Sequence, residues 1–231
     1  MPIKVVLDTS VYRSDKFRLG QGFKTLGDLC KSCNVKVMIP HVVKREFETQ
    51  LDGDAAEIVA GFEKSGKHLA RGPIPGDLRA KLDDLLGEFK SRRQEVINSH
   101  KLNFSEWLAE CGVKELALTG AQALAAMDNY FSGGPPFKSA KARDDIPDAM
   151  IYQILLHAAE DEPIVFVCND KNLSSKVGGV RNITHYTDIN GLIASANIQA
   201  IITEREAAER VTNLLRSLEQ LASVLPNPLA E

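Results

Sequence analysis

The stretch Ile3–Ser10, IKVVLDTS, decides the fold that we expect. Its first five residues form a short apolar run, which predicts a buried β-strand. The run ends at once in the polar residues Asp8, Thr9 and Ser10. A strand that is apolar on both faces is typical of a parallel sheet covered by helices. The sequence therefore predicts an α/β domain that begins with a buried strand.

Strands and helices alternate on either side of the middle of the chain. Apolar spacing predicts helices at Phe23–Cys30 and His41–Leu51, and an apolar run predicts a strand at Val35–Ile39. Two further strands are expected at 163–168 and 183–187. Strands separated by helices form parallel βαβ units. The sequence therefore predicts a three-layer α/β/α sandwich around a central, mostly parallel sheet.

The middle of the chain differs, because we find no convincing strand between about residue 52 and about residue 143. Helices are expected on both sides of the breaker at 71–76, and then at Leu78–Ile97, Glu106–Cys111 and Thr119–Phe131. The stretch Ser132–Arg143, SGGPPFKSAKAR, is rich in Gly and Pro and then basic, which is typical of a mobile loop. We therefore expect one domain over residues 1–231, with a helical insertion at about 52–143.

The last part of the chain, at about 203–224, is predicted to be an amphipathic helix. Its apolar face would consist of Ala207, Val211, Leu214, Leu215, Leu218 and Leu221. This face and the helical insertion are the two candidate interfaces with a partner.

Composition and charge exclude several classes of protein. Hydrophobic residues make up 44% and charged residues 26% of the chain, which is the balance of a globular protein and excludes a mainly disordered one. The sequence has neither an apolar run long enough to cross a membrane nor a secretory signal. Four cysteines in 231 residues do not make a disulfide scaffold. These features are typical of a cytoplasmic protein without a membrane partner.

The charge is distributed unevenly, although the net charge is only −3. Residues 64–143 carry 13 basic and 9 acidic groups, whereas residues 144–231 carry 6 basic and 13 acidic groups. A basic region between regions rich in carboxylates would suit a polyanion held over a metal site. A difference of this size also arises by chance, so both interpretations stay open.

Acidic residues lie where ligands bind in open parallel sheets, just beyond the carboxyl ends of the strands. Asp8 follows the first strand directly, and Asp170 closely follows the strand expected at 163–168. Glu46 lies on the helix after the second strand. Asp145 and Asp148 open the helix before the 163–168 strand, and their spacing puts them on one helix face. The fold would bring these acids together at one edge of the sheet.

Carboxylates clustered in this way point to a metal-dependent reaction. They repel one another and raise each other's pKa unless a cation neutralises them. Hard divalent ions such as Mg²⁺ or Mn²⁺ prefer oxygen ligands. Two such ions can stabilise the attacking and leaving oxygens when a phosphodiester is cleaved. The acids therefore predict a nuclease.

Each acid also has a purely structural interpretation. Glu46 could belong to a solvated helix face, because its neighbours in the sequence are charged. Asp145 could cap a helix, since Pro147 suits a first helical turn. Asp170 could cap the short segment that follows it, and Asp8 could start a turn. The sequence leaves these alternatives open.

Four segments together resemble the PIN domain superfamily, whose members are mostly metal-dependent ribonucleases. They are LDTSVY (Leu7–Tyr12), VVKRE (Val42–Glu46), DDIPDAMIYQIL (Asp144–Leu155) and IVFVCNDKNL (Ile164–Leu173). More narrowly, the chain looks like a bacterial PIN-like family with a long helical insertion. The resemblance covers residues 1–51 and 132–190, and it implies the parallel α/β/α sandwich expected above.

The resemblance also implies roles for particular residues. The catalytic acids would be Asp8, Glu46, Asp148 and Asp170, and Mg²⁺ or Mn²⁺ would bind Asp8, Asp145, Asp148 and Asp170. Ser10 and Asn169 would orient a ligand or a water molecule. Together these roles predict an endoribonuclease. The alternative is a PIN-like module that binds RNA or protein without cutting.

The basic loop and the partners complete these expectations. Lys138, Lys141 and Arg143 would neutralise the phosphates of a nucleic acid, RNA more readily than DNA. Phe137 would either stack on a base or anchor the loop in the core. Many relatives form dimers and some pair with an antitoxin. The resemblance therefore implies a homodimer, or a regulatory protein such as an antitoxin, as further partners.

Overall fold

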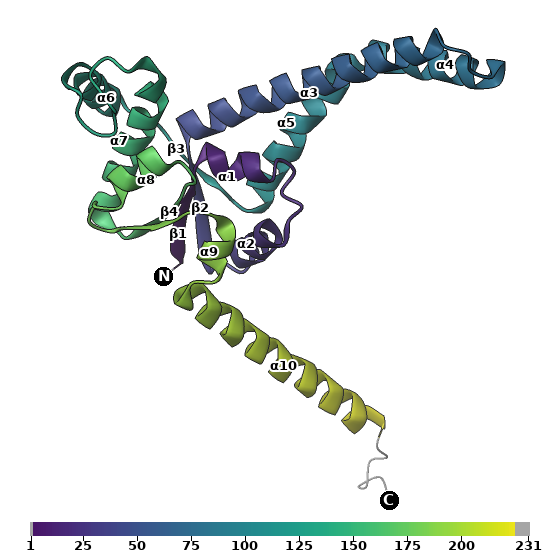
Figure 1. Cartoon of the computed structure of the whole chain (residues 1–231). Coiled ribbons are helices and arrows are strands. Elements are labelled where there is room, and N and C mark those ends of the chain that lie inside the picture. Colours follow the sequence, from purple (N-terminus) through teal and green to yellow (C-terminus); the bar gives the residue numbers. More distant parts are fainter. Residues whose placement is uncertain (1, 225–231) are drawn as a thin grey trace, which may run out of the picture. The chain divides into compact units, whose positions relative to one another are not determined.

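The computed structural model describes residues 2–224, and within them five parallel strands form one sheet (Figure 1). The strand order is β3-β2-β1-β4-β5. The strands are β1 (Ile3–Leu7), β2 (Val35–Pro40), β3 (Lys114–Leu116), β4 (Ile164–Val167) and β5 (Ile183–Tyr186). Every pairing in the sheet is parallel, so the predicted sheet is confirmed.

Two helical layers cover this sheet, which confirms the three-layer prediction. Figure 1 shows α1 (Thr9–Ser14), α2 (Gln21–Lys31) and α3 (His41–Ala70) on one side of the strands. The helices α6 (Gly120–Ser132), α7 (Ile146–Asp161) and α8 (Lys171–Val177) lie on the other side. The direction in which the chain moves across the sheet reverses after β3. Because parallel crossovers are right-handed, that reversal puts the later helices on the opposite face.

The strand order changes direction between β1 and β4, which are neighbours in the sheet. Leu7 of β1 lies beside Val167 of β4, and both strands are buried at their carboxyl ends. The chains leaving β1 and β4 therefore diverge from one point at this edge. A crevice at such a point is where ligands bind in doubly wound sheets.

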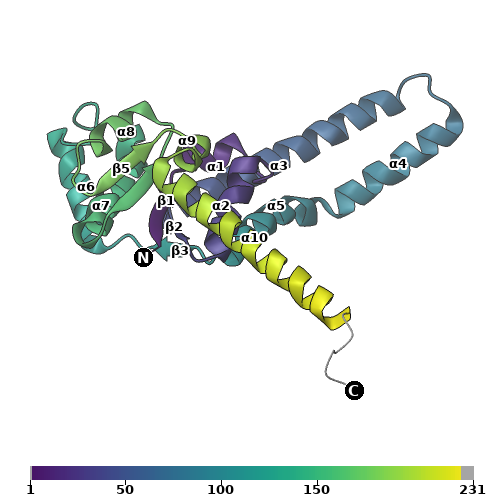
Figure 2. The ribbon, with the colours of Figure 1, turned by 90° about the horizontal axis from the view of Figure 1, so that it is seen from below.

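A helical arm projects from the sheet in both views of the molecule (Figures 1 and 2). It consists of α3, α4 (Gly76–Ser91) and α5 (Arg93–Glu110). Gly66 of α3 lets α4 approach closely, because a Cβ there would meet Leu86 at 2.6 Å. The single helix predicted at 78–97 is wrong, since the chain breaks at Arg92 into two helices.

The prediction of no strand between 52 and 143 is also wrong, because β3 lies in that region. The strand has three residues, of which two are charged and exposed, so the sequence contains no apolar run that would predict it. Its place is set by contacts that are distant in sequence. It pairs with β2, and Glu115 accepts hydrogen bonds from Lys44 at 2.7 Å and lies 2.6 Å from His41 on α3.

Aromatic rings form the core where the arm joins the sheet. Tyr12 lies at the centre of this cluster, with its ring centroid 5.3–6.1 Å from four other rings. Those rings belong to Phe23, Phe47, Phe104 and Trp107. The cluster therefore joins α1, α2, α3 and α5 directly behind the polar residues that follow β1.

A second, smaller core fixes the loop at 133–142. Phe137 is only 3% exposed and packs with Ala126, Tyr130 and Ala149 between α6 and α7. The backbone N–H of Lys141 donates to the carbonyl of Tyr130 at 2.7 Å. The expectation of a mobile loop is therefore wrong, and Phe137 acts as the anchor rather than as an exposed stacking platform.

Among the described residues, 190–224 form a second compact unit. Its main element is α10 (Ala196–Val224), which follows the short helix α9 (Ile189–Ile193). The helix predicted at about 203–224 is present and begins seven residues earlier. Leu221 lies outside the residues whose side chains are described. None of the helices in residues 2–224 is long and apolar enough to cross a membrane.

Candidate active site

Asp8 is a buried acid at the sheet edge, with 6% of its surface exposed. Its backbone N–H still donates to Val167 of β4, at 3.0 Å, and its side chain caps α1. The Oδ2 atom accepts hydrogen bonds from the backbone N–H of Ser10 at 3.0 Å and from the Ser10 hydroxyl at 2.6 Å. The Ser10 Oγ accepts in turn from the backbone N–H of Asn169 at 3.0 Å. Ser10 therefore links Asp8 to the end of β4.

Glu46 faces the end of β1 rather than solvent. Its Oε2 accepts a hydrogen bond from the hydroxyl of buried Thr9 at 2.7 Å. Its Oε1 accepts from Gln50 at 3.2 Å, one helical turn along α3. The interpretation as a solvated helix face is therefore wrong. Two hydrogen bonds fix the Glu46 carboxylate, and one of them comes from Thr9, the residue that follows Asp8 in the chain.

Asp170 caps a helix and also lies at the end of β4, where the candidate site is expected. Its Oδ1 accepts hydrogen bonds from the backbone N–H groups of Asn172 at 2.7 Å and Leu173 at 2.9 Å, so it caps α8 as the structural interpretation held. The cap uses Oδ1 only and leaves Oδ2 outside it. The capped geometry fixes an exposed carboxylate at the end of β4.

Asp145 occupies the N-cap position of α7, but its side chain makes no capping hydrogen bond. The carboxylate is 5% exposed and binds the basic loop instead. Its Oδ2 accepts from the backbone N–H of Lys138 at 3.1 Å, and its Oδ1 lies 3.6 Å from the Lys138 ammonium. Asp145 therefore holds the loop against the start of α7.

The pKa of the Asp148 carboxyl depends on all of these acids. Burial raises the pKa of this half-buried carboxyl, and the negative charges of Asp170, Asp8, Asp145 and Glu46 raise it further, in that order, to about 7. Its ordinary value is 3.8. The five acids come from four separate stretches of the chain. The fold thus brings together every acid that the sequence singled out, closely enough for their charges to act on one carboxyl.

The donor chemistry of this acidic cluster suits a hard divalent cation, because every candidate ligand is a carboxylate oxygen. A cation would also offset the repulsion that raises the pKa of Asp148. Among the side chains described, those of residues 2–220, however, no group of three or more His, Cys, Asp or Glu is arranged to hold a metal ion. The carboxylate oxygens are therefore suitable ligands for a divalent metal ion. The described side chains are not arranged around one common point at which such an ion would bind.

The sequence model of the PIN domain family matches residues 5–173. The chain belongs to the PIN domain family. No curated protein and no solved structure matches it significantly. PIN domains are generally nucleases and typically use divalent metal ions. The match is one span, so it includes residues 52–131, for which the sequence alone showed no resemblance.

The basic loop of this PIN domain borders the acidic cluster. The side chains of Lys138, Lys141 and Arg143 are exposed. The loop is fixed at one end by Asp145, and the side-chain amide of Asn172 donates to the carbonyl of Pro136 at 3.1 Å at the start of α8. The loop, which connects α6 to α7 in the chain, therefore also contacts α8, the helix that Asp170 caps.

Sequence reasoning missed three residues that position this site: Thr9, Gln50 and Asn172. The position of Thr9 between two selected residues was a usable signal, because a hydroxyl beside a strand end commonly finds a buried partner. No comparable signal marks Gln50 or Asn172, since each acts through a partner that only the folded chain supplies.

Proposed function

We propose that this PIN domain protein is an endoribonuclease that depends on Mg²⁺ or Mn²⁺. The observation that carries the proposal is that the fold places four further acids near Asp148, three of them from distant parts of the chain; together with burial, their charges raise the pKa of its carboxyl. A fold gains no stability from assembling like charges, so such clusters are typical of functional sites. Membership in a family whose members are generally nucleases supports the same conclusion.

The side chains would divide the work as follows. Asp8, Asp148 and Asp170 would hold the metal, with Asp145 as a further ligand, and Glu46 would act at the same site as a catalytic acid. Bound there, the metal would supply positive charge for the attacking and leaving oxygens of the phosphodiester. Ser10 and Thr9 fix two of the acids in place through their hydroxyl groups.

The basic loop would hold the substrate. Lys138, Lys141 and Arg143 are exposed and would contact phosphates of the RNA on either side of the cleaved bond. Lys138 lies directly beside one of the acids, because its ammonium is 3.6 Å from Asp145. Phosphate contacts of this kind position a strand without reading its sequence.

A non-catalytic PIN module that binds RNA or protein is the second candidate. It is favoured by one observation, namely that the acids in residues 2–220 form no group arranged to hold a metal ion. A site that only binds a partner would need no such arrangement.

Cleavage of single-stranded and structured RNA and DNA separates the two candidates. Wild-type protein with Mn²⁺ or Mg²⁺ should cut RNA, EDTA should stop it, and Asp148→Asn should lower the rate at least about 100-fold. Asp161→Asn is the matched control, because it removes the same charge from an exposed position at the far end of α7. The melting temperature should also rise with Mn²⁺ in wild type and not in Asp148→Asn. A folded wild type that binds RNA and never cuts it would establish the binding module instead.

A further inference from the structure

A basic groove lies on the outer part of α3, far along the arm from the acids. It has a volume of about 610 Å³ and is lined by Gly61, Lys64, Ser65, Lys67, His68 and Arg71. All six residues are exposed. The lining contains three full positive charges and no acidic side chain. We call Lys64, Lys67 and Arg71 the basic face of the arm.

The nearest acid in the sequence, Glu63, pairs with only one base of this face. The side chain of Glu63 is only 16% exposed, and its Oε1 is buried without a hydrogen-bond partner among the described residues. Its Oε2 lies 3.9 Å from the ammonium of Lys67, whose side chain is 61% exposed. Lys67 is therefore paired with a largely buried acid, whereas Lys64 and Arg71 are exposed and form no ion pair among the described residues.

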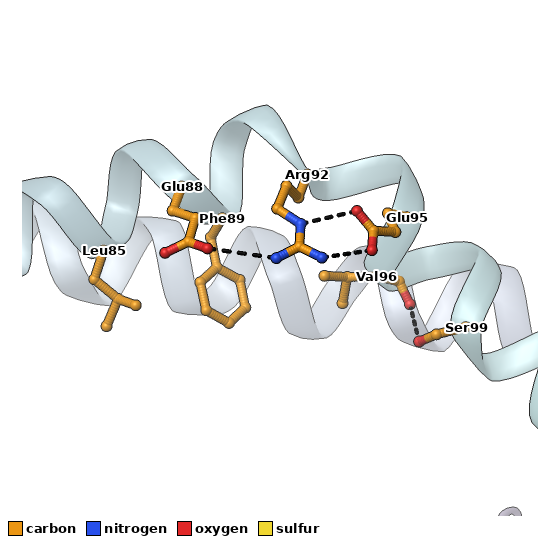
Figure 3. Close-up of a pocket in the computed structure, with 7 residues that line it drawn as sticks. All are labelled: Leu85, Glu88, Phe89, Arg92, Glu95, Val96 and Ser99. Atoms are coloured by element: carbon orange, nitrogen blue, oxygen red, sulfur yellow. Dashed lines mark hydrogen bonds and ion pairs between the residues drawn. The ribbon is translucent and has the colours of Figure 1, made fainter.

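A second groove on the arm shows the opposite arrangement. At the junction of α4 and α5, Arg92 lies between two glutamates (Figure 3). Its guanidinium donates to Glu95 at 2.6 and 2.8 Å and to Glu88 at 3.4 Å. A cation held by two carboxylates is a poor partner for a phosphate, so the α3 groove is the one suited to an anion.

The helix dipole explains only part of the basic face. Basic residues in the last turn of a helix offset the partial negative charge at its C-terminus. Lys67 and His68 occupy that turn of α3. Lys64 lies one turn earlier, beyond the range over which the dipole acts, and it faces the same groove.

The distance from the acids is set by a single helix. Glu46, which Thr9 holds at the acidic cluster, lies on α3 together with the basic face. At a rise of 1.5 Å per residue, Lys64 lies about 27 Å and His68 about 33 Å along the helix from Glu46. That span equals roughly 8 to 10 steps of a nucleic-acid strand at about 3.4 Å each.

We infer that the basic face of the arm binds the phosphates of an RNA strand whose other part lies at the acidic cluster, so that the arm favours long substrates. The inference rests on the proposed function for the chemistry at the cluster. The charge of the groove matches the phosphodiester backbone, and its distance from Glu46 sets the length of stacked RNA that reaches both sites.

Binding of a fluorescent RNA of about 30 nucleotides tests the inference without any cleavage, in EDTA and over a range of salt concentrations. The variant combines Lys64→Gln, Lys67→Gln and Arg71→Gln. Its affinity should fall at least about tenfold, and the slope of log K against log salt should fall by about 2, as expected for three lost contacts to a single strand. The matched control combines Lys24→Gln, Lys31→Gln and Lys36→Gln, which are also exposed and lie on α2 and β2. It should bind like wild type.

Cleavage kinetics supply the second readout. The triple variant should raise KM for the long RNA about tenfold and leave kcat unchanged. Its KM for an RNA of about three nucleotides, too short even when fully extended to reach from the acids to Lys64, should equal that of wild type. A melting curve separates this effect from a loss of helix stability, because a merely structural role would lower the melting temperature and affect both substrates equally.

The outcomes are distinct. Unchanged affinity and KM in the triple variant would overturn the inference and leave the proposed function intact. Equal losses in the triple variant and the control would also overturn it, since net charge rather than the arm would then act. Preference for DNA of the same length over RNA would overturn the choice of RNA. A wild type that binds neither nucleic acid would overturn the inference and the proposed function together.

Discussion

Asp148 is subject to two effects that act in the same direction, since burial and four neighbouring carboxylates both disfavour its charge. Its pKa of about 7 in the folded protein lies above the ordinary 3.8, so the folded protein holds this proton more tightly than the unfolded chain does. The resulting stabilisation is complete below pH 3.8 and is lost as the pH rises through about 7. Without metal, wild type should therefore lose more stability between about pH 5 and pH 8 than Asp148→Asn does.

Melting curves in EDTA at both pH values measure this difference. The variant serves as its own control for every other titrating group, because only the carboxyl of residue 148 is removed. Parallel pH profiles for the two proteins would show that the acids do not act on Asp148 in solution.

Tyr12 makes a second residue-scale prediction, because burial leaves its hydroxyl without a hydrogen-bond partner among the described residues. Burial also raises the pKa of this phenol. A buried polar group without a partner is costly, so Tyr12→Phe should stabilise the protein by about 1 kcal/mol, or by about 2–4 °C in melting temperature. Tyr12→Ala should instead cost about 3–5 kcal/mol, since it empties the centre of the aromatic cluster. A loss of stability in Tyr12→Phe would reveal a partner for the hydroxyl.

At the scale of one element, the loop at 133–142 is anchored in a small apolar core by the side chain of Phe137. Phe137→Ala should cost about 3 kcal/mol in a urea titration, the lower end for a buried ring, because the cluster that it fills is small. Phe131→Ala is the matched control, since Phe131 is 60% exposed and its loss should change stability by less than about 0.5 kcal/mol. If Phe137 stacked on a base, its removal would lower RNA affinity and leave the stability unchanged.

The elements that could be predicted are those whose own sequence carries the signal. The apolar runs at β1 and β4 and the acids that follow them need no distant partner to be recognised, and they define the sheet edge and most of the candidate site. The three-residue β3 carries two charges and exists because β2 lies beside it. Likewise, Glu46 resembles a solvated acid until the fold brings Thr9 to it. Contacts between segments that are far apart along the chain could not be predicted, because no single stretch of sequence carries a signal for them.

At the scale of the whole molecule, α10 exposes large apolar side chains that no contact described above covers. Val211, Leu214, Leu215 and Leu218 are 56–64% exposed. The steps of three and four residues from Val211 to Leu214 to Leu218 follow the spacing of a two-stranded coiled coil. Exposed apolar surface of this kind marks an interface, and a helix with such a seam can pair with the same helix of a second copy.

We therefore expect the wild type to dimerise through α10, as sedimentation equilibrium over micromolar concentrations would show. Leu214→Glu combined with Leu218→Glu should weaken the dimer at least about tenfold, because four buried charges would face one another across the seam. Thr212→Glu combined with Asn213→Glu adds the same charge at exposed polar positions and should leave the dimer intact. Cleavage of RNA should persist in both variants, since every proposed catalytic acid precedes residue 171. A wild type that stays monomeric at about 100 μM would instead assign the α10 seam to a different protein.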